Sequence, residues 1–150
     1  MKKLIKLIAT FFYLGYAPWL PGTVASGAAV LLYFLFRGNL YFYTFFLLLV
    51  TAAGFLVCAP AERIFQEKDS KKIVIDEVAG LLLAFWGLAP EPILIITGFF
   101  IFRILDGIKV YPANKIEKLD GACGIMGDDL IAGLYTNIIL QIAIRILPWI

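Results

Sequence analysis

The sequence predicts an all-α, polytopic membrane protein in which about five spanning or re-entrant helices form one bundle. First, 62% of the 150 residues are hydrophobic and 16% are charged, whereas a soluble domain is roughly 45–50% apolar and about 25% charged. Second, the apolar residues occur in runs separated by glycine, proline and charged residues. Third, lysine and arginine lie almost entirely on one side of these runs. A soluble domain of this size would leave much of that apolar surface in water, so a bilayer is the expected surrounding.

The N-terminal segment begins with basic residues, Lys2, Lys3 and Lys6. No small-residue cleavage site follows a clean apolar stretch, and Pro18 and Pro21 interrupt the segment after it. A secretory signal peptide needs an uninterrupted apolar stretch and a small-residue cleavage site after it. We therefore expect an amphipathic lead-in that is retained and lies at the membrane interface.

Five apolar runs are candidate spans, because a spanning helix needs about 20 apolar residues, and fewer when its ends lie in the interface. In order, they cover residues 24–36, 40–59, 73–89, 93–105 and 130–147. The second run is the clearest, since it contains no charged residue, and the first is short. The breaker-rich segments 37–39, 89–92 and 121–127 are expected to be loops. With no internal repeat, residues 1–150 are expected to form one membrane domain.

Basic residues are distributed unequally between the connections, and in membrane proteins the short cytoplasmic loops carry the excess. One side of the expected topology carries ten of them: Lys2, Lys3, Lys6, Arg63, Lys68, Lys71, Lys72, Lys109, Lys115 and Lys118. The other side carries only Arg37 and Arg145. We therefore expect the N-terminus and both long loops to be cytoplasmic, and the C-terminus to lie outside.

This topology places five carboxylates at the cytoplasmic face. Asp76 and Glu77 begin the third run from that side, Asp106 ends the fourth, and Asp128 and Asp129 begin the fifth. Acidic residues at helix N-termini interact favourably with the helix dipole, by about 0.3–1 kcal/mol each, so each one alone has a purely structural interpretation. Five clustered anions repel one another, however, and their convergence favours a functional site.

Two cations accompany this cluster. Arg103 and Lys109 lie three residues to either side of Asp106, a spacing that a helix would place on adjacent turns of one face. Two positive charges do not balance five carboxylates, and a divalent metal would fill the deficit. Hard oxygen ligands, in a chain with no histidine, favour Mg²⁺, Mn²⁺ or Ca²⁺ over zinc or copper.

A small residue follows each of the two acidic pairs, Asp76-Glu77 and Asp128-Asp129. Gly80 and Gly133 each lie about one turn beyond an acidic pair, and small residues let membrane helices approach closely. At the start of the first run, Gly22 and Thr23 could bind phosphate through free backbone N–H groups, with Thr23 as the helix cap. The glycine-rich segment 121–127 could wrap a ligand.

Several chemistries are excluded by composition. The absence of histidine removes phosphohistidine enzymes, Ser-His-Asp triads and histidine-ligated metals, and no P-loop is present. The net charge of +2 gives no reason to expect nucleic-acid binding. Phosphate chemistry would then depend on metal-activated water.

Four motifs together resemble the bacterial phosphatidylglycerophosphatase A family. They are GYAPWLPGT at 15–23, DEVAG at 76–80, FRILDGIK at 102–109 and GACGIMGDDLIAG at 121–133, and they occur in the family's order. The resemblance implies a Mg²⁺-dependent enzyme of the inner membrane that hydrolyses phosphatidylglycerophosphate to phosphatidylglycerol and phosphate. The chain departs from the family at Val110, which replaces a proline, and at Ala122, which replaces a glycine; neither is an expected ligand.

The resemblance and the converging charges together suggest roles for individual residues. Asp76, Glu77, Asp128 and Asp129 are expected to bind one or two Mg²⁺ ions, and Asp106 either binds metal or orients the attacking water. Arg103 and Lys109 are expected to hold the phosphomonoester and offset charge in the transition state, with further contacts from Gly22 and Thr23. The expected catalytic residues are thus Asp106, Asp129, Arg103 and Lys109.

Three other functions are compatible with parts of the pattern. A phosphotransferase that moves a phosphoalcohol between lipids also uses carboxylates at the membrane surface, but its long aspartate signature is absent. A transporter or lipid-flipping protein could hold an ion at the acidic site, but such proteins generally have internal repeats. A structural membrane subunit would leave the converging charges unexplained.

Overall fold

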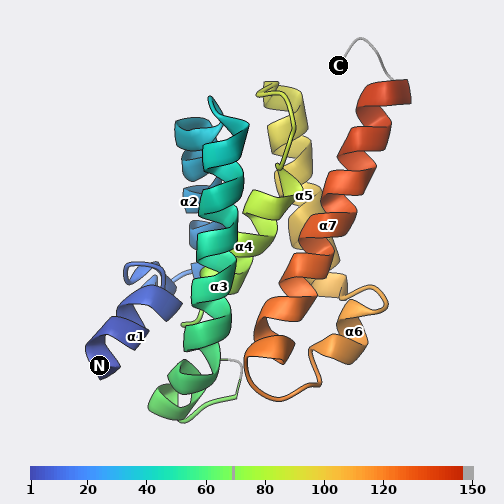
Figure 1. The fold of residues 1–150 in the computed structure, drawn as a ribbon. Coiled ribbons are helices and arrows are strands. Elements are labelled where there is room, and N and C mark those ends of the chain that lie inside the picture. The colour runs from blue at the N-terminus through green and yellow to red at the C-terminus, as the bar shows by residue number, and fades with distance from the viewer. Residues whose placement is uncertain (69, 147–150) are drawn as a thin grey trace.

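The computed structural model describes residues 1–68 and 70–146, and within them the chain is all-helical, as predicted (Figure 1). It has seven α-helices and one 3₁₀ helix in these two ranges: α1 (Lys2–Ala9), η1 (Leu14–Tyr16), α2 (Pro21–Phe36), α3 (Leu40–Phe65), α4 (Ile75–Ala84), α5 (Pro92–Ile108), α6 (Ala113–Ile116) and α7 (Ala122–Ile146).

The short helix α4 forms the centre of the bundle. Eight of its ten residues are buried, because α7 packs along it most extensively and α2 and α3 cover its other sides. The helix α5 packs mainly against α7. Since α4 carries Asp76 and Glu77, the bundle holds two acidic side chains at its core.

Helices α3 and α7 are long and apolar enough to cross a membrane. With 26 and 25 residues they extend about 39 and 38 Å, against about 30 Å for a bilayer's hydrocarbon core. The outer face of α3 exposes large apolar side chains such as Tyr41, Phe45 and Leu56, a surface suited to lipid. The other helices are shorter than 18 residues, so the five expected crossings stay a prediction.

The expected third span, 73–89, is occupied by a much shorter helix. At ten residues α4 extends about 15 Å and ends inside the bundle. Side chains from its neighbours bind the carbonyl groups at this end: Tyr43 donates to Leu82 O at 2.6 Å, and Asn137 Nδ2 donates to Ala84 O at 3.0 Å. The helix can end before the apolar run does, because side chains from neighbouring helices bind its last carbonyl groups.

The expectation of a flexible loop at 121–127 is wrong, because α7 begins at Ala122. Its glycines serve close packing. A Cβ at Gly124 would overlap the carbonyl oxygen of Leu119, and one at Gly127 would overlap the side chain of Ile116. Asp128 and Asp129 therefore lie two turns inside α7 and not at its N-terminus, so they do not interact with its dipole as first-turn residues. Leu147, the expected end of this run, lies outside the described residues.

Other helix boundaries also differ from the expected runs. The helix α3 continues through Pro60 to Phe65, and α5 extends to Ile108. The helix α2 begins at Pro21 with Leu20 as its N-cap and no side-chain cap, so the expected capping role of Thr23 is wrong.

Figure 1 shows that α1, the C-terminal end of α3, α6 and the beginning of α7 lie at one end of the bundle. The ten basic residues counted above belong to these segments and the connections beside them. The loop that carries Arg37 and the end of α7 that carries Arg145 lie at the opposite end. The charge asymmetry of the sequence therefore follows the long axis of the bundle.

Candidate active site

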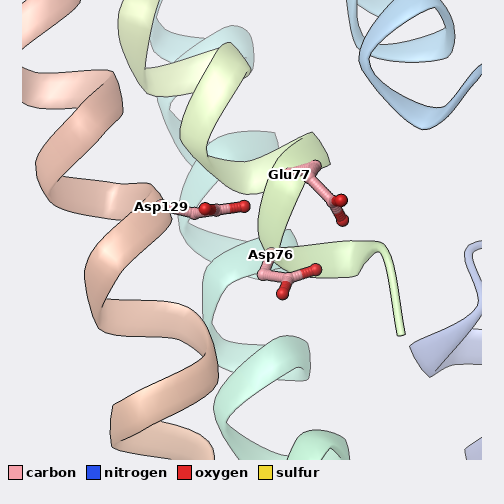
Figure 2. A group of neighbouring side chains, drawn as sticks. All are labelled: Asp76, Glu77 and Asp129. Carbon is pink, nitrogen blue, oxygen red and sulfur yellow. The ribbon is translucent and has the colours of Figure 1, made fainter. Parts of the chain in front are cut away.

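Three carboxylates meet where the beginning of α4 faces α7. Asp76 and Glu77 occupy the first turn of α4, and Asp129 approaches them from α7 (Figure 2). One oxygen from each of the three side chains lies within 4.8 Å of the others. Side chains far apart in sequence thus form one compact group of acidic oxygens.

Two glycines allow this approach. A Cβ on Gly80 would lie 2.6 Å from the backbone oxygen of Asp129 and 2.8 Å from the ring of Phe102, and a Cβ on Gly133 would overlap the carbonyl oxygen of Gly80. The two backbones are therefore in direct contact one turn beyond the acidic residues. This confirms the expectation that these glycines serve the close approach of the two helices.

All five predicted carboxylates line a single cavity of about 130 Å³. Asp76, Glu77, Asp106, Asp128 and Asp129 come from α4, α5 and α7. Lys109 completes the wall on one side, and Ser70, Lys71 and Ile73 contribute from the connection between α3 and α4. The structure thus brings together the acidic residues that the topology placed at one membrane face.

The two predicted cations bind carboxylates in and around this cavity. Arg103 Nη1 lies 2.9 Å from Asp106 Oδ2 on the same helix, one turn away. Lys109 donates to Asp128 and also lies 3.2 Å from Glu117 Oε2. Lys109 is the C-cap residue of α5, and its backbone has a left-handed conformation with φ of 52°.

Two opposing effects set the pKa of the Lys109 ammonium group. Burial lowers the pKa, but the hydrogen bond and charge of Asp128, together with Glu117, raise it overall above its ordinary value. Lys109 therefore stays protonated near neutral pH and supplies a fixed positive charge, not a proton.

The cavity fits a hard divalent cation. Asp76, Asp128 and Asp129 are 7%, 6% and 4% exposed, and buried anions need compensation. Oδ1 of Asp76 and Oε2 of Glu77 are buried with no hydrogen-bond partner among the described residues. Unpaired carboxylate oxygens in an all-oxygen donor set are the ligands that Mg²⁺, Mn²⁺ and Ca²⁺ prefer.

The beginning of α2 lies against this group without lining the cavity. A Cβ on Gly22 would overlap Glu77 Oε1 and would lie 3.4 Å from Arg103 Nη1, so the Glu77 carboxylate occupies the space that any other side chain at position 22 would need. Thr23 is half-buried one residue further. Phosphate binding by Gly22 and Thr23 stays a prediction.

Glu117 is a site residue that the sequence did not reveal. It lies eight residues after Lys109, across the short helix α6, and the two residues belong to no common helix whose spacing could be read from the sequence. The sequence shows Lys71 only as one of several loop charges, whereas the structure places it among the residues that line the cavity. Both positions depend on how the two loops fold over the acidic residues.

The sequence matches the family described as Phosphatidylglycerophosphatase A over residues 7–144. Three curated relatives are 31–32% identical to it. One, from Bacteroides thetaiotaomicron, carries the provisional description phosphatidylinositol-3-phosphatase and is 32% identical over 91% of each chain. Two are described as Phosphatidylglycerophosphatase A: an Escherichia coli protein, 31% identical over 89% of this chain and 80% of its own, and a Haemophilus influenzae protein, 32% identical over 91% and 86%. No solved structure matches the chain.

Proposed function

The chain belongs to the phosphatidylglycerophosphatase A family, and from this membership we propose that it hydrolyses the phosphomonoester of phosphatidylglycerophosphate, releasing phosphatidylglycerol and phosphate. One observation supports the proposal above the others. Five carboxylates and a protonated lysine from separate parts of the chain line one small cavity. A lipid phosphatase that lacks histidine needs such a site to hold both metal and phosphate.

Mg²⁺ is the proposed cofactor. Asp76, Glu77 and Asp129 would hold it, because their oxygens already converge and two are unpaired, with Asp128 as a further ligand. Bound there, Mg²⁺ would lower the pKa of a coordinated water and neutralise phosphate oxygens.

The remaining polar side chains position the phosphomonoester and the water. Lys109 lines the cavity as a permanent cation, so it holds phosphate oxygens and offsets the negative charge that grows in the transition state. Asp106 is oriented by its ion pair with Arg103, and its carboxylate accepts a hydrogen bond from the attacking water. Arg103 keeps Asp106 in place and contributes positive charge beside Gly22.

The protein would act on its substrate from the cytoplasmic face of the cell's inner membrane. The site lies toward the end of the bundle that carries the ten basic residues, and basic residues remain on the cytoplasmic side. The exposed apolar faces of α3 and α7 lie in the bilayer. The lipid tails remain in the membrane while the headgroup enters the cavity.

The first test is phosphate release from phosphatidylglycerophosphate by the purified protein in detergent micelles. We expect release with Mg²⁺ and none with excess EDTA, and activity should return when Mg²⁺ is added back. No release in either condition, from protein shown to be folded by circular dichroism, would refute the proposed reaction.

A second substrate follows from the Bacteroides relative. Phosphatidylinositol 3-phosphate also carries a phosphomonoester on a lipid headgroup, and a cavity lined by carboxylates and two lysines does not by itself distinguish the two alcohols. Both lipids should be compared in identical micelles with Mg²⁺. A kcat/KM that is higher for the inositol lipid would reassign the preferred substrate without changing the reaction.

A further inference from the structure

The cavity has one wall that the proposed chemistry does not use. It is formed by the connection between α3 and α4, from which Ser70, Lys71 and Ile73 line the space. Ser70 is buried and donates a 2.6 Å hydrogen bond to Glu67, while Lys71 is exposed. Lys71 therefore lies where the cavity meets its surroundings, above buried acidic residues.

Lys71 differs from the other cations around the cavity in its partners. Arg103 is bound to Asp106, and Lys109 is bound to Asp128 and Glu117. No ion pair joins Lys71 to an acidic residue in the part of the chain that the structure describes. Its charge is consequently available to an anion that enters from outside.

The substrates of the proposed reaction have a second anion to offer. Phosphatidylglycerophosphate carries a terminal phosphomonoester and a phosphodiester that links the headgroup to the diacylglycerol. The phosphomonoester must reach the buried carboxylates at the base of the cavity, so the phosphodiester stays nearer the mouth, next to the tails. Lysine binds phosphate oxygens as a compact, mobile point charge.

We infer that Lys71 forms a second phosphate subsite, which binds the phosphodiester of the lipid while its phosphomonoester occupies the carboxylate cavity. This inference rests on the proposed function. It predicts selectivity for lipids with two phosphates over phosphatidic acid, whose only phosphate is the phosphomonoester.

The neighbouring residue provides a matched control. Lys72 is also exposed, but it does not line the cavity, and its Nζ lies 5.8 Å from the ring centre of Tyr16 and 5.5 Å from that of Phe65. Removing the charge of Lys72 changes the surface potential as much as removing that of Lys71 does, without changing the cavity.

The test compares Lys71→Gln, Lys71→Arg and Lys72→Gln on phosphatidylglycerophosphate and phosphatidic acid, in the same mixed micelles with Mg²⁺. In Lys71→Gln the ratio of kcat/KM for the two lipids should fall about tenfold, equivalent to about 1.4 kcal/mol. The ratio should be largely restored in Lys71→Arg and unchanged in Lys72→Gln. An equal loss on both lipids, or the same fall in Lys72→Gln, would show a general effect of charge and overturn the inference.

A binding measurement separates this inference from the proposed reaction. Phosphatidylglycerol has the phosphodiester but no phosphomonoester, and its retention by the protein can be measured by native mass spectrometry in EDTA. Lys71→Gln should retain less of it than the unsubstituted protein and Lys72→Gln do. Equal retention in all three would refute the subsite even if the enzyme hydrolyses phosphatidylglycerophosphate, whereas absent hydrolysis with reduced retention would refute only the reaction.

Discussion

The contact between Gly80 and Gly133 predicts a large effect from one added methyl group. In Gly133→Ala, the new Cβ would overlap the carbonyl oxygen of Gly80. Because this oxygen belongs to the backbone of α4, no side chain can rotate away, and the two helices must separate. Asp129 lies one turn before Gly133, so the separation also moves it from Asp76 and Glu77.

The magnitude follows from two opposing terms. Overpacking costs about 1–3 kcal/mol, and contact with a backbone belongs at the upper end of that range. Replacing a helical glycine by alanine returns about 1 kcal/mol of helix propensity. The net loss is about 1–2 kcal/mol, or about 2–8 °C in Tm at 2–4 °C per kcal/mol. Misplacing a site by about 1 Å can cost about 100-fold in rate, so phosphate release should fall at least tenfold.

Gly27→Ala is the matched control for this experiment. Gly27 is in α2, and a Cβ there would meet nothing within 4 Å, so the same substitution should leave Tm and activity equal or slightly higher. Thermal unfolding in detergent and phosphate release with Mg²⁺ measure both quantities. If Gly133→Ala matches Gly27→Ala in both, the close approach of the helices does not position the site.

Three further substitutions test other parts of the site. Asp129→Asn should reduce phosphate release at least 100-fold while Tm stays within a few degrees, because an amide replaces an anionic metal ligand but keeps its shape; activity near that of the unsubstituted protein would remove Asp129 from the metal site. Glu117→Gln should lower kcat/KM only two- to fivefold, since Lys109 keeps its bond to Asp128 and the Lys109–Glu117 pair is partly solvated, a kind of ion pair that contributes about 0–1 kcal/mol; a loss as large as that of Asp129→Asn would give Glu117 a direct role. Asn137→Leu should lower stability by about 2–6 kcal/mol, because the carbonyls of Ala84 and Trp86 each lose a donor at about 1–3 kcal/mol; an unchanged Tm would mean that water replaces the amide.

The sequence was sufficient to predict the helical class and the convergence of the acidic residues. Both follow from patterns that the chain carries locally: apolar runs, and acidic residues at the ends of those runs that face the basic loops. Convergence did not require the correct number of crossings. It required only that the acidic residues of α4, α5 and α7 meet at one depth, and that condition survives both the shortening of α4 and the earlier start of α7.

The errors arose where one residue type serves two purposes. Glycines at 121–127 suggested a flexible loop, but Gly124 and Gly127 are helical residues that make room for Leu119 and Ile116. The length of α4 was overestimated because its C-terminal carbonyls are bound by Tyr43 and Asn137 from other helices. Neither partner can be identified from spacing along the chain, since each contact exists only after the bundle has formed.

One regularity explains why the site is formed by α4 and α7. Asp76, Gly80 and Ala84 follow at four-residue intervals on α4, and Asp129, Gly133 and Asn137 do so on α7. Corresponding residues of the two series contact each other: the carboxylates of Asp76 and Asp129 converge, the backbones of Gly80 and Gly133 touch, and the Asn137 amide donates to the Ala84 carbonyl. Residues four apart lie on one helix face.

This face therefore fixes the register of two parallel helices at three successive levels. Sliding α7 along α4 by one residue would place a side chain against the Gly80 backbone and remove the amide from the carbonyls at the end of α4. The separation of Asp76 and Asp129 is thus set by contacts that contain no charge. The repulsion between the two carboxylates cannot relax by helix movement, and a cation held between them, as proposed, would relieve it.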